Sequence, residues 1–448
     1  MVVNWLKRWL KKPVTSDALV SISRDEHDVS RRGISHNALK VLYRLQNSGH
    51  EAYLVGGCVR DLQLKLAPKD FDVATDATPE QVRKLFSNSR IIGRRFRIVH
   101  VTFGREIIEV TTFRGKADEA DSDQKQSAEG MLLRDNVYGN LEDDARRRDF
   151  TINAMYYTAK DFSIKAYPIG MQDLANKVIR IIGDAETRYR EDPVRMLRAI
   201  RFAGKLDFDI EPTTAKPISE VASLLTHIAP ARLFDEVVKL LMSGNGLKTW
   251  QLMQKYQLLE PLLPQTHQIL ESTQDSYYND FINQALTNTD ARINAHKAVT
   301  PAFLYAALLW PAVKEQADYN IQMGTPEMPA WQKAMGQVLD RQVKTVAIPK
   351  RFSIPMKEIW ELQLRLPKRR GLRAEQLLTH PRFRAAYDFL LLRESAGEKL
   401  DDLGKWWTDY QERNPDQRAN MRTVLGQQQA PKKRRRRKPS NTAPKTEG

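Results

Sequence analysis

The chain has 448 residues, a formal net charge of +16 and one cysteine, Cys58. This length predicts about two to four domains, and the excess of Lys and Arg favours a phosphate-rich partner, either nucleic acid or an anionic membrane. A single cysteine excludes an internal disulfide and fits a reducing compartment. No run of about 18 apolar residues is present that could span a membrane, and we expect a cytoplasmic protein.

Residues 1–33 are predicted to be a mobile, basic N-terminal segment. Its start, MVVNWLKRWLKKP, places Trp5, Leu6, Trp9 and Leu10 at helical spacing. A short exposed helix is the favoured interpretation. Contact of this helix with an anionic membrane surface is the weaker alternative.

Residues 34–115 are predicted to form a small mixed sheet with helices on it. HNALKVLYRLQNSG is amphipathic with a helical period, and TPEQVRKLF carries a capping box before its apolar face. AYLVGG and DFDVATD have the length of short buried strands. RIVHVTF and EIIEVTTF are joined at Gly104 and Arg105 like a hairpin.

Two aspartates in DFDVATD are spaced so that one strand face carries both. Successive side chains of a strand alternate between faces, so Asp70 and Asp72 are expected to point the same way. Carboxylates so placed repel unless a cation lies between them, and Mg²⁺ is commonly shared between carboxylates and substrate phosphates. A solvated strand is the alternative for an isolated Asp-x-Asp pattern.

A glycine pair just before these aspartates favours a phosphate site. Gly56 and Gly57 follow one strand and precede VRDL, a helix start whose free N–H groups can meet phosphate oxygens. Arg60, one turn further, would add charge-assisted hydrogen bonds. The sequence leaves two candidates open for a third carboxylate of this site: Glu109 in EIIEV and Asp149 in ARRRDFTINAM.

The segment EDPVRMLRAIRFA predicts a helix that reads a base. Asp192 is expected to be its N-cap and Pro193 its first residue, with Arg195, Arg198 and Arg201 on one stripe. A carboxylate accepts hydrogen bonds and a guanidinium donates them. Such a pair suits adenine and cytosine, whose edges present an amino donor beside a ring-nitrogen acceptor. It does not suit uracil and guanine, which present the reverse pattern. Asp192 with Arg195 would therefore accept ATP or CTP without separating the two.

The remainder is predicted to be helical and to end in a basic run. Strands become scarce after about residue 165, and PARLFDEVVKLLMSG and FRAAYDFLLLRESA have helical spacing. PKKRRRRKPS cannot form a core, and its charge favours RNA phosphates over a merely solvated tail. The predicted RNA-binding residues there are Lys432, Lys433, Arg434, Arg435, Arg436, Arg437 and Lys438.

Four of these segments together resemble the bacterial tRNA nucleotidyltransferase/poly(A) polymerase family, the class II nucleotidyltransferases. LVGGCVRD, KDFDVATDATP, RRDFTINAM and EDPVRMLRAIRFA stand in that family's order, between residues 53 and 205. The resemblance implies an α+β chain: a polymerase β-like nucleotidyltransferase head with a small mixed sheet, then an all-helical neck and body. The expected domains are a mobile segment 1–33, a catalytic head 34–165, a neck 166–225 for nucleotide selection and RNA binding, an RNA-binding body 226–427 and a disordered basic tail 428–448.

Position by position, the resemblance implies roles for the residues of the motifs. Asp70 and Asp72 would ligate Mg²⁺ and, with Asp149, would be the catalytic carboxylates. Glu109 is a candidate for a further metal ligand from its strand position and not from the resemblance. The implied nucleotide contacts are Gly57, Arg60, Arg148, Asp192, Arg195 and Arg198, and the glycine-pair argument adds Gly56 to them.

IIGRRFRIVHVTFGREIIEVTTFR and the basic tail are similar to the poly(A) polymerase branch of the family. The implied activity is untemplated addition of AMP from ATP to RNA 3′ ends, with RNA turnover as its consequence and RNA-decay proteins as further partners. A CCA-adding tRNA nucleotidyltransferase is the alternative within the family. A non-catalytic RNA-binding protein is the alternative from another class.

Overall fold

The computed structural model describes residues 4–11, 18–93, 97–115, 124–126, 132–135, 137–273 and 276–428. They form two compact units. One comprises residues up to 272 with 286–299 and 340–348, and the other comprises 273–285, 300–339 and the chain from 349 onwards. Within the described ranges, no helix has the length and apolar character needed to cross a membrane.

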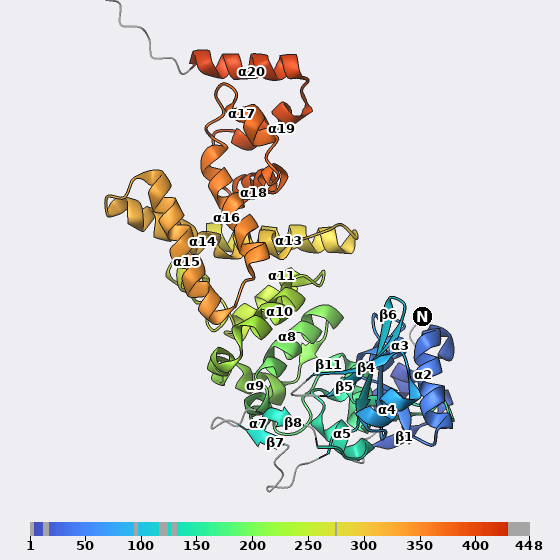
Figure 1. Ribbon diagram of the computed structural model, residues 1–448. Helices are drawn as coiled ribbons and strands as arrows, with labels where there is room; N and C mark the ends of the chain where they lie inside the picture. The colour runs from blue at the N-terminus through green and yellow to red at the C-terminus, as the bar shows by residue number, and fades with distance from the viewer. Residues whose placement is uncertain are drawn as a thin grey trace, which may run out of the picture. The chain divides into compact units, whose positions relative to one another are not determined.

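An eight-stranded sheet organises the N-terminal part of the first unit (Figure 1). Its strands run in the order β1-β10-β9-β2-β3-β6-β5-β4, with β3 and β6 parallel and the other neighbours antiparallel. The bounds are β1 (Val20–Ile22), β2 (Ala52–Val55), β3 (Asp72–Thr75), β4 (Ser89–Ile92), β5 (Ile98–Phe103), β6 (Glu106–Thr112), β9 (Met155–Tyr157) and β10 (Ile164–Ala166).

Helices and short elements around this sheet complete the head. They are α1 (Asn4–Lys11), η1 (Arg24–Glu26), η2 (Arg31–Gly33), α2 (His36–Asn47), α3 (Gly57–Gln63), α4 (Pro79–Leu85), α5 (Leu141–Arg147), η3 (Thr151–Asn153) and α6 (Pro168–Asn176). Two small sheets pair β7 (Gln124–Gln126) with β8 (Leu132–Asp135) and β11 (Val178–Ile179) with β12 (Asp209–Ile210).

Local sequence signals account for several of these elements. Ser35 caps α2, whose apolar face is fully buried, and Thr78 and Gln81 form the predicted capping box of α4. The predicted hairpin is also present: Phe103 pairs with Glu106 across Gly104, which has a φ of +61°. The mixed sheet with helices on it is therefore as predicted.

The N-terminal segment differs from its prediction. The Trp5 and Trp9 side chains are 3% and 2% exposed, and α1 packs against α6. Strand β1 belongs to the large sheet, so the described part of this segment is not a mobile lead-in. Leu10 remains exposed, but burial of both indole rings removes most of the apolar face that membrane contact requires.

Beyond β11 the described residues are almost entirely helical, as predicted. The elements are α7 (Ala185–Glu191), α8 (Val194–Leu206), α9 (Pro212–Glu220), η4 (Ala222–His227), α10 (Pro230–Leu241), α11 (Gly246–Lys255), α12 (Pro264–Ser272), α13 (Tyr277–Asn294), α14 (Pro301–Gln322), α15 (Glu327–Thr345), α16 (Lys350–Arg365), α17 (Arg373–Leu378), α18 (Phe383–Ser395), α19 (Leu403–Glu412) and α20 (Pro415–Gln428). In the second unit, buried aromatic rings dominate the core: Trp310 stacks on Trp331, and Trp407 packs among Phe383 and Tyr410.

Candidate functional site

A sharp turn between β2 and α3 begins the site. Gly56 has φ +77° and ψ −132°, a conformation that side-chain-bearing residues rarely adopt, and its N–H donates to the Met155 carbonyl at 3.2 Å. A Cβ atom at Gly56 would lie 3.5 Å from Arg148 Nη1. Gly57 then begins α3, as the sequence predicts. The turn therefore brings the backbone close to the Arg148 guanidinium.

The predicted aspartates lie where β3 begins. Asp72 is the first residue of β3, whereas Asp70 precedes the strand and is exposed. The prediction that one face of the strand carries both aspartates is therefore wrong, because Asp70 is not part of the strand. In the parallel register Asp72 lies opposite Glu109 of β6, and paired residues of neighbouring strands point to the same face. The structure therefore brings Glu109 beside Asp72.

These carboxylates repel one another. Burial raises the pKa of Asp72 to about 6, with repulsion from Glu109 as the next cause and Asp70 as a smaller one. Mg²⁺ takes oxygen ligands and is commonly held by one or two carboxylates plus substrate phosphates, so this set of donors fits it. Among the described residues no three His, Cys, Asp or Glu side chains converge closely enough to hold a metal by themselves, so substrate phosphates would have to supply the remaining ligands.

Sequence reasoning missed His100 on β5. Its Nε2 lies 3.2 Å from Glu109 Oε1, and the two residues are opposite each other in the β5–β6 register. The Gly104–Arg105 turn carried the signal, because a two-residue hairpin loop pairs residue 100 with residue 109. His100 is therefore a neighbour of the acidic cluster formed by Asp70, Asp72 and Glu109.

Asp149, the other candidate for the third carboxylate, has different partners. Its Oδ2 accepts from Arg198 Nε at 2.6 Å and Nη2 at 2.5 Å, and its Oδ1 accepts from the Phe150 N–H and from Asn153 Nδ2. Burial alone would raise the pKa of Asp149, but the Arg198 charge and these donors lower it to about 2. Asp149 is therefore ionised at neutral pH and anchored to α8.

Asn153 links Asp149 to a buried arginine. Its Oδ1 accepts from Arg60 Nη1 at 2.6 Å, and Arg60, 2% exposed, also donates twice to Asp61 Oδ1. The predicted phosphate ligand Arg60 thus has three hydrogen bonds within the protein. Its guanidinium lies 5.0 Å from the centre of the Phe202 ring of α8. Asn153 and Phe202 had no signal in the sequence, because both act through tertiary contacts.

Arg148, named only through the family resemblance, is held at the Gly56 turn. Its Nε donates to the Tyr156 hydroxyl at 2.7 Å, and its Nη2 donates to Asp144 Oδ2 at 3.0 Å. These contacts fix the guanidinium near the turn, while Nη1 is the atom that faces Gly56.

The predicted base-reading pair differs from expectation in one respect. Asp192 is not the N-cap of α8: it is the C-cap of α7, and α8 begins at Val194 after Pro193. The reason is that α7 extends to Glu191, so Asp192 lies in the turn between α7 and α8. Its Oδ2 accepts from Arg232 Nη2 at 2.9 Å, whereas its buried Oδ1 has no hydrogen-bond partner among the described residues.

Among the described residues, no hydrogen bond or ion pair joins the Arg195 guanidinium to the Asp192 carboxylate. Its Nη1 donates to Glu191 Oε2 and to the Arg188 carbonyl, both at 2.8 Å. Sequence reasoning missed Glu191, which holds this guanidinium. The Asp192 Oδ1 atom is thus an acceptor without a partner among the described residues, and the Arg195 guanidinium is a donor that Glu191 and the Arg188 carbonyl hold in place. The predicted RNA-binding residues Lys432 to Lys438 lie outside the described residues.

Family models match three parts of the chain. They are described as the poly A polymerase head domain over residues 52–180, the probable RNA and SrmB-binding site of polymerase A over 207–270, and the polymerase A arginine-rich C-terminus over 323–441. The head match contains the Gly56 turn, the carboxylates and Asp149.

Whole-chain comparisons agree with these models. The chain is 50% identical to poly(A) polymerase I of Salmonella typhi over 444 residues, which cover 98% of this chain and 95% of the relative. It is 40% identical to the CCA-adding enzyme of Bacillus subtilis over 225 residues, 50% of this chain and 55% of the relative.

A solved structure shares the fold. The Bacillus stearothermophilus CCA-adding enzyme in complex with CTP matches with a TM-score of 0.56 and 24% identity, covering 87% of this chain and 82% of that one. The similarity to poly(A) polymerase I extends over nearly the whole chain, whereas that to the CCA-adding enzyme of Bacillus subtilis stops at half. The chain therefore belongs to the poly(A) polymerase I branch of the tRNA nucleotidyltransferase/poly(A) polymerase family.

Proposed function

We propose that this protein adds AMP from ATP to RNA 3′ ends without a template. The observation that carries the proposal is the 50% identity to poly(A) polymerase I over 98% of the chain. The reaction is attack of an RNA 3′-hydroxyl on the α-phosphate of ATP, with pyrophosphate as the leaving group. Catalysis then consists mainly of positioning and charge neutralisation.

The acidic cluster is the proposed metal site. Asp70 and Asp72 would hold Mg²⁺, and Glu109, opposite Asp72 in register, would be a further ligand. Bound Mg²⁺ would neutralise phosphate charge and activate the attacking hydroxyl. The raised pKa of Asp72 supports this assignment, because a cation between the carboxylates relieves their repulsion.

The residues around the turn are proposed to hold the triphosphate. The backbone of Gly56 and Gly57 can approach phosphate oxygens closely, and Arg148 lies beside that turn. Arg60 contacts Asp61 and Asn153, so its contribution is to orient Asn153 and, through it, Asp149. Asp149 in turn orients Arg198, whose side chain is 37% exposed and can face the nucleotide.

Base selection is assigned to the start of α8. The Asp192 Oδ1 atom is buried and unpaired, so it can accept from the amino group of adenine. Arg195, held by Glu191, can donate to the neighbouring ring nitrogen. Uracil and guanine, which have the reversed pattern, would leave Asp192 unpaired, and this discriminates by several powers of ten. Cytosine has the same pattern as adenine, so the exclusion of CTP rests on the similarity to poly(A) polymerase I and not on this pair.

The roles of the neck, the body and the basic tail, and the cellular setting, are also proposed. The helical neck at residues 166–225 and body at 226–427 would bind RNA, together with the basic run Lys432 to Lys438. The setting would be the cytoplasm, where the tails promote RNA decay and decay proteins become partners. CCA addition to tRNA is the second candidate, supported by the 40% identity of half the chain to a CCA-adding enzyme.

Incubation with each nucleotide separately tests the proposal. Purified protein, Mg²⁺ and a non-tRNA oligonucleotide should give a long ladder with ATP and almost no addition with CTP, GTP or UTP. The Asp72→Asn variant, which keeps the side-chain shape, is the control and should give no ladder. Incorporation of CTP as readily as ATP would contradict the proposal.

A further inference from the structure

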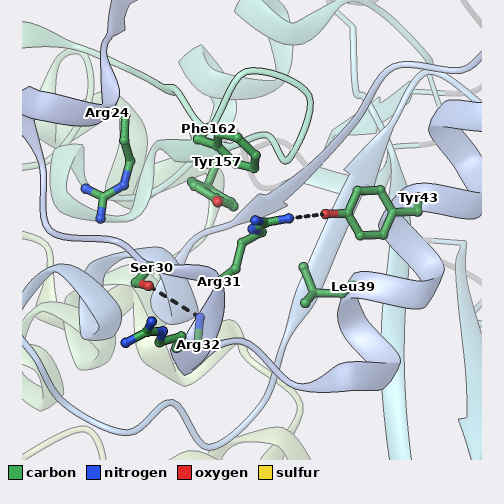
Figure 2. A pocket seen from close by; sticks show the side chains of 8 residues that line it. All are labelled: Arg24, Ser30, Arg31, Arg32, Leu39, Tyr43, Tyr157 and Phe162. Atoms are coloured by element: carbon green, nitrogen blue, oxygen red, sulfur yellow. Dashed lines mark hydrogen bonds between the residues drawn. The ribbon is translucent and has the colours of Figure 1, made fainter.

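A pocket of about 480 Å³ lies on the head, away from the acidic cluster. Asp72, Val55 and Tyr156 are partners in register, so their side chains share one face of the sheet. Tyr157, the next residue along β9, points to the opposite face. Its ring lines this pocket together with Arg24, Ser30, Arg31, Arg32, Leu39, Tyr43 and Phe162 (Figure 2).

Three arginines make the pocket strongly basic. Arg24, Arg31 and Arg32 are all exposed. Arg24 donates to the His27 carbonyl at 2.8 Å and Arg31 to the Tyr43 hydroxyl at 3.2 Å, and both of these acceptors are neutral. None of the ion pairs found among the described residues includes any of the three guanidinium groups. The pocket therefore offers three positive charges that form no ion pair within the described chain, although the Asp161 carboxylate, next to Phe162, acts on Tyr157 from nearby.

Aromatic rings stand beside these charges. Figure 2 shows Arg31 between Tyr43 on one side and Tyr157 and Phe162 on the other, and its guanidinium carbon lies 4.6 Å from the centre of the Phe162 ring. Phe162 has a φ of +61°, a backbone conformation that a bulky residue rarely adopts. Strained residues of this kind cluster at ligand sites.

A buried histidine holds the Phe162 turn in place. His27 is 3% exposed, its Nδ1 accepts from the Val29 N–H at 3.2 Å, and its Nε2 therefore donates to the Phe162 carbonyl at 2.9 Å. The segment that carries the arginines and the turn that carries the aromatic ring are thus tied together. The arginine side chains and the Phe162 ring therefore belong to one preformed surface.

We propose that this pocket binds one nucleotide unit of an RNA strand, at a position distinct from the reacting 3′ end. The inference rests on the proposed RNA substrate. Arg24 and Arg32 neutralise the two phosphates that flank that unit, and its base stacks on the surface formed by Phe162 and Arg31. Unpaired bases bind proteins by stacking on aromatic side chains and on guanidinium planes, and cationic side chains neutralise the backbone.

Matched variants with the same loss of charge test the phosphate contacts. Arg24→Gln, Arg31→Gln and Arg32→Gln are combined in one variant, and Arg83→Gln, Lys84→Gln and Arg105→Gln, exposed on the same unit, form the control. Affinity for oligoadenylate is measured without ATP across a salt series. The pocket variant should lower the slope of log K against log salt by about 1.4, since Arg24 and Arg32 each neutralise one phosphate and each neutralised phosphate of a single strand contributes about 0.7.

Substitutions of Phe162 test the base contact. Phe162→Ala should weaken oligoadenylate binding by about fivefold or more with an unchanged salt slope, and Phe162→Tyr should restore it, because loss of one stacked base costs about 1–3 kcal/mol. Polyglutamate, which carries charge without bases, should compete poorly for the pocket. Unfolding measurements verify that all variants are folded.

Three outcomes would overturn the inference: equal losses of affinity and slope in the pocket and control variants, no effect of Phe162→Ala, or competition by polyglutamate as strong as that by oligoadenylate. AMP addition to a short primer should survive in the pocket variant, because the reacting groups are untouched. If the protein bound RNA as described but added no AMP, the proposed function would fail and the pocket would stand.

Discussion

Arg198→Met removes the guanidinium that holds Asp149. The structure has two Arg198 nitrogens within 2.6 Å of Asp149 Oδ2, with Asp149 9% exposed and Arg198 37% exposed. Loss of one partner of a fully buried ion pair costs about 3–5 kcal/mol, and an exposed pair contributes about 0–1 kcal/mol. Because this pair is buried on one side only, we expect a loss of about 2 kcal/mol in the free energy of unfolding.

Chemical denaturation of the variant and of a control measures this loss. Arg190→Met removes a pair with Glu186 on α7 at a similar distance, 2.6 Å, but with side chains 45% and 50% exposed. That control should lose less than about 0.5 kcal/mol. Arg198→Met should also raise KM for ATP, whereas Arg190→Met should not. Equal stability losses in the two variants would refute the argument that burial makes the Asp149 pair strong.

Three further predictions concern the head. Glu109→Gln should lose clearly less activity than Asp149→Asn at saturating Mg²⁺, and the reverse order in steady-state kinetics would make Glu109 the more important carboxylate. Gly56→Ala should destabilise the protein by about 1–3 kcal/mol in urea unfolding because φ is +77° there, whereas Gly57→Ala, at a helical position, should be nearly neutral. Burial lowers the pKa of His27 below its ordinary 6.5, so its contribution to stability is present above about pH 6.5 and is lost as the pH falls further. His27→Gln should show a smaller loss of stability between about pH 7 and about pH 5 than the unmodified protein.

Local patterns predicted much of the head. Alternation along RIVHVTF and EIIEVTTF with a two-residue turn was sufficient for the β5–β6 hairpin, and Thr78 with Gln81 was sufficient for the start of α4. Gly56 was predictable as a special backbone position because a glycine pair follows a buried strand. These features depend on a few consecutive residues, and those residues are sufficient to determine them.

Features that depend on distant contacts were not predictable in the same way. The link from Arg60 through Asn153 to Asp149 joins residues 60, 153 and 149, and no local period reports it. The placement of Asp192 failed for a related reason: the sequence has a good N-cap residue before Pro193, but α7 occupies the preceding turn. The burial of Trp5 and Trp9 depends on α6, more than 150 residues away in the chain.

Sequencing of the products made from two RNAs in one mixture tests the central claim most directly. The mixture contains a tRNA that lacks its CCA end, an unrelated RNA, both ATP and CTP, and Mg²⁺. We expect homopolymeric A tails on both RNAs, because the chain is similar to poly(A) polymerase I over nearly its whole length and the proposed RNA contacts do not depend on tRNA shape. Addition of CCA to the tRNA alone, with the unrelated RNA unextended, would contradict the proposed function.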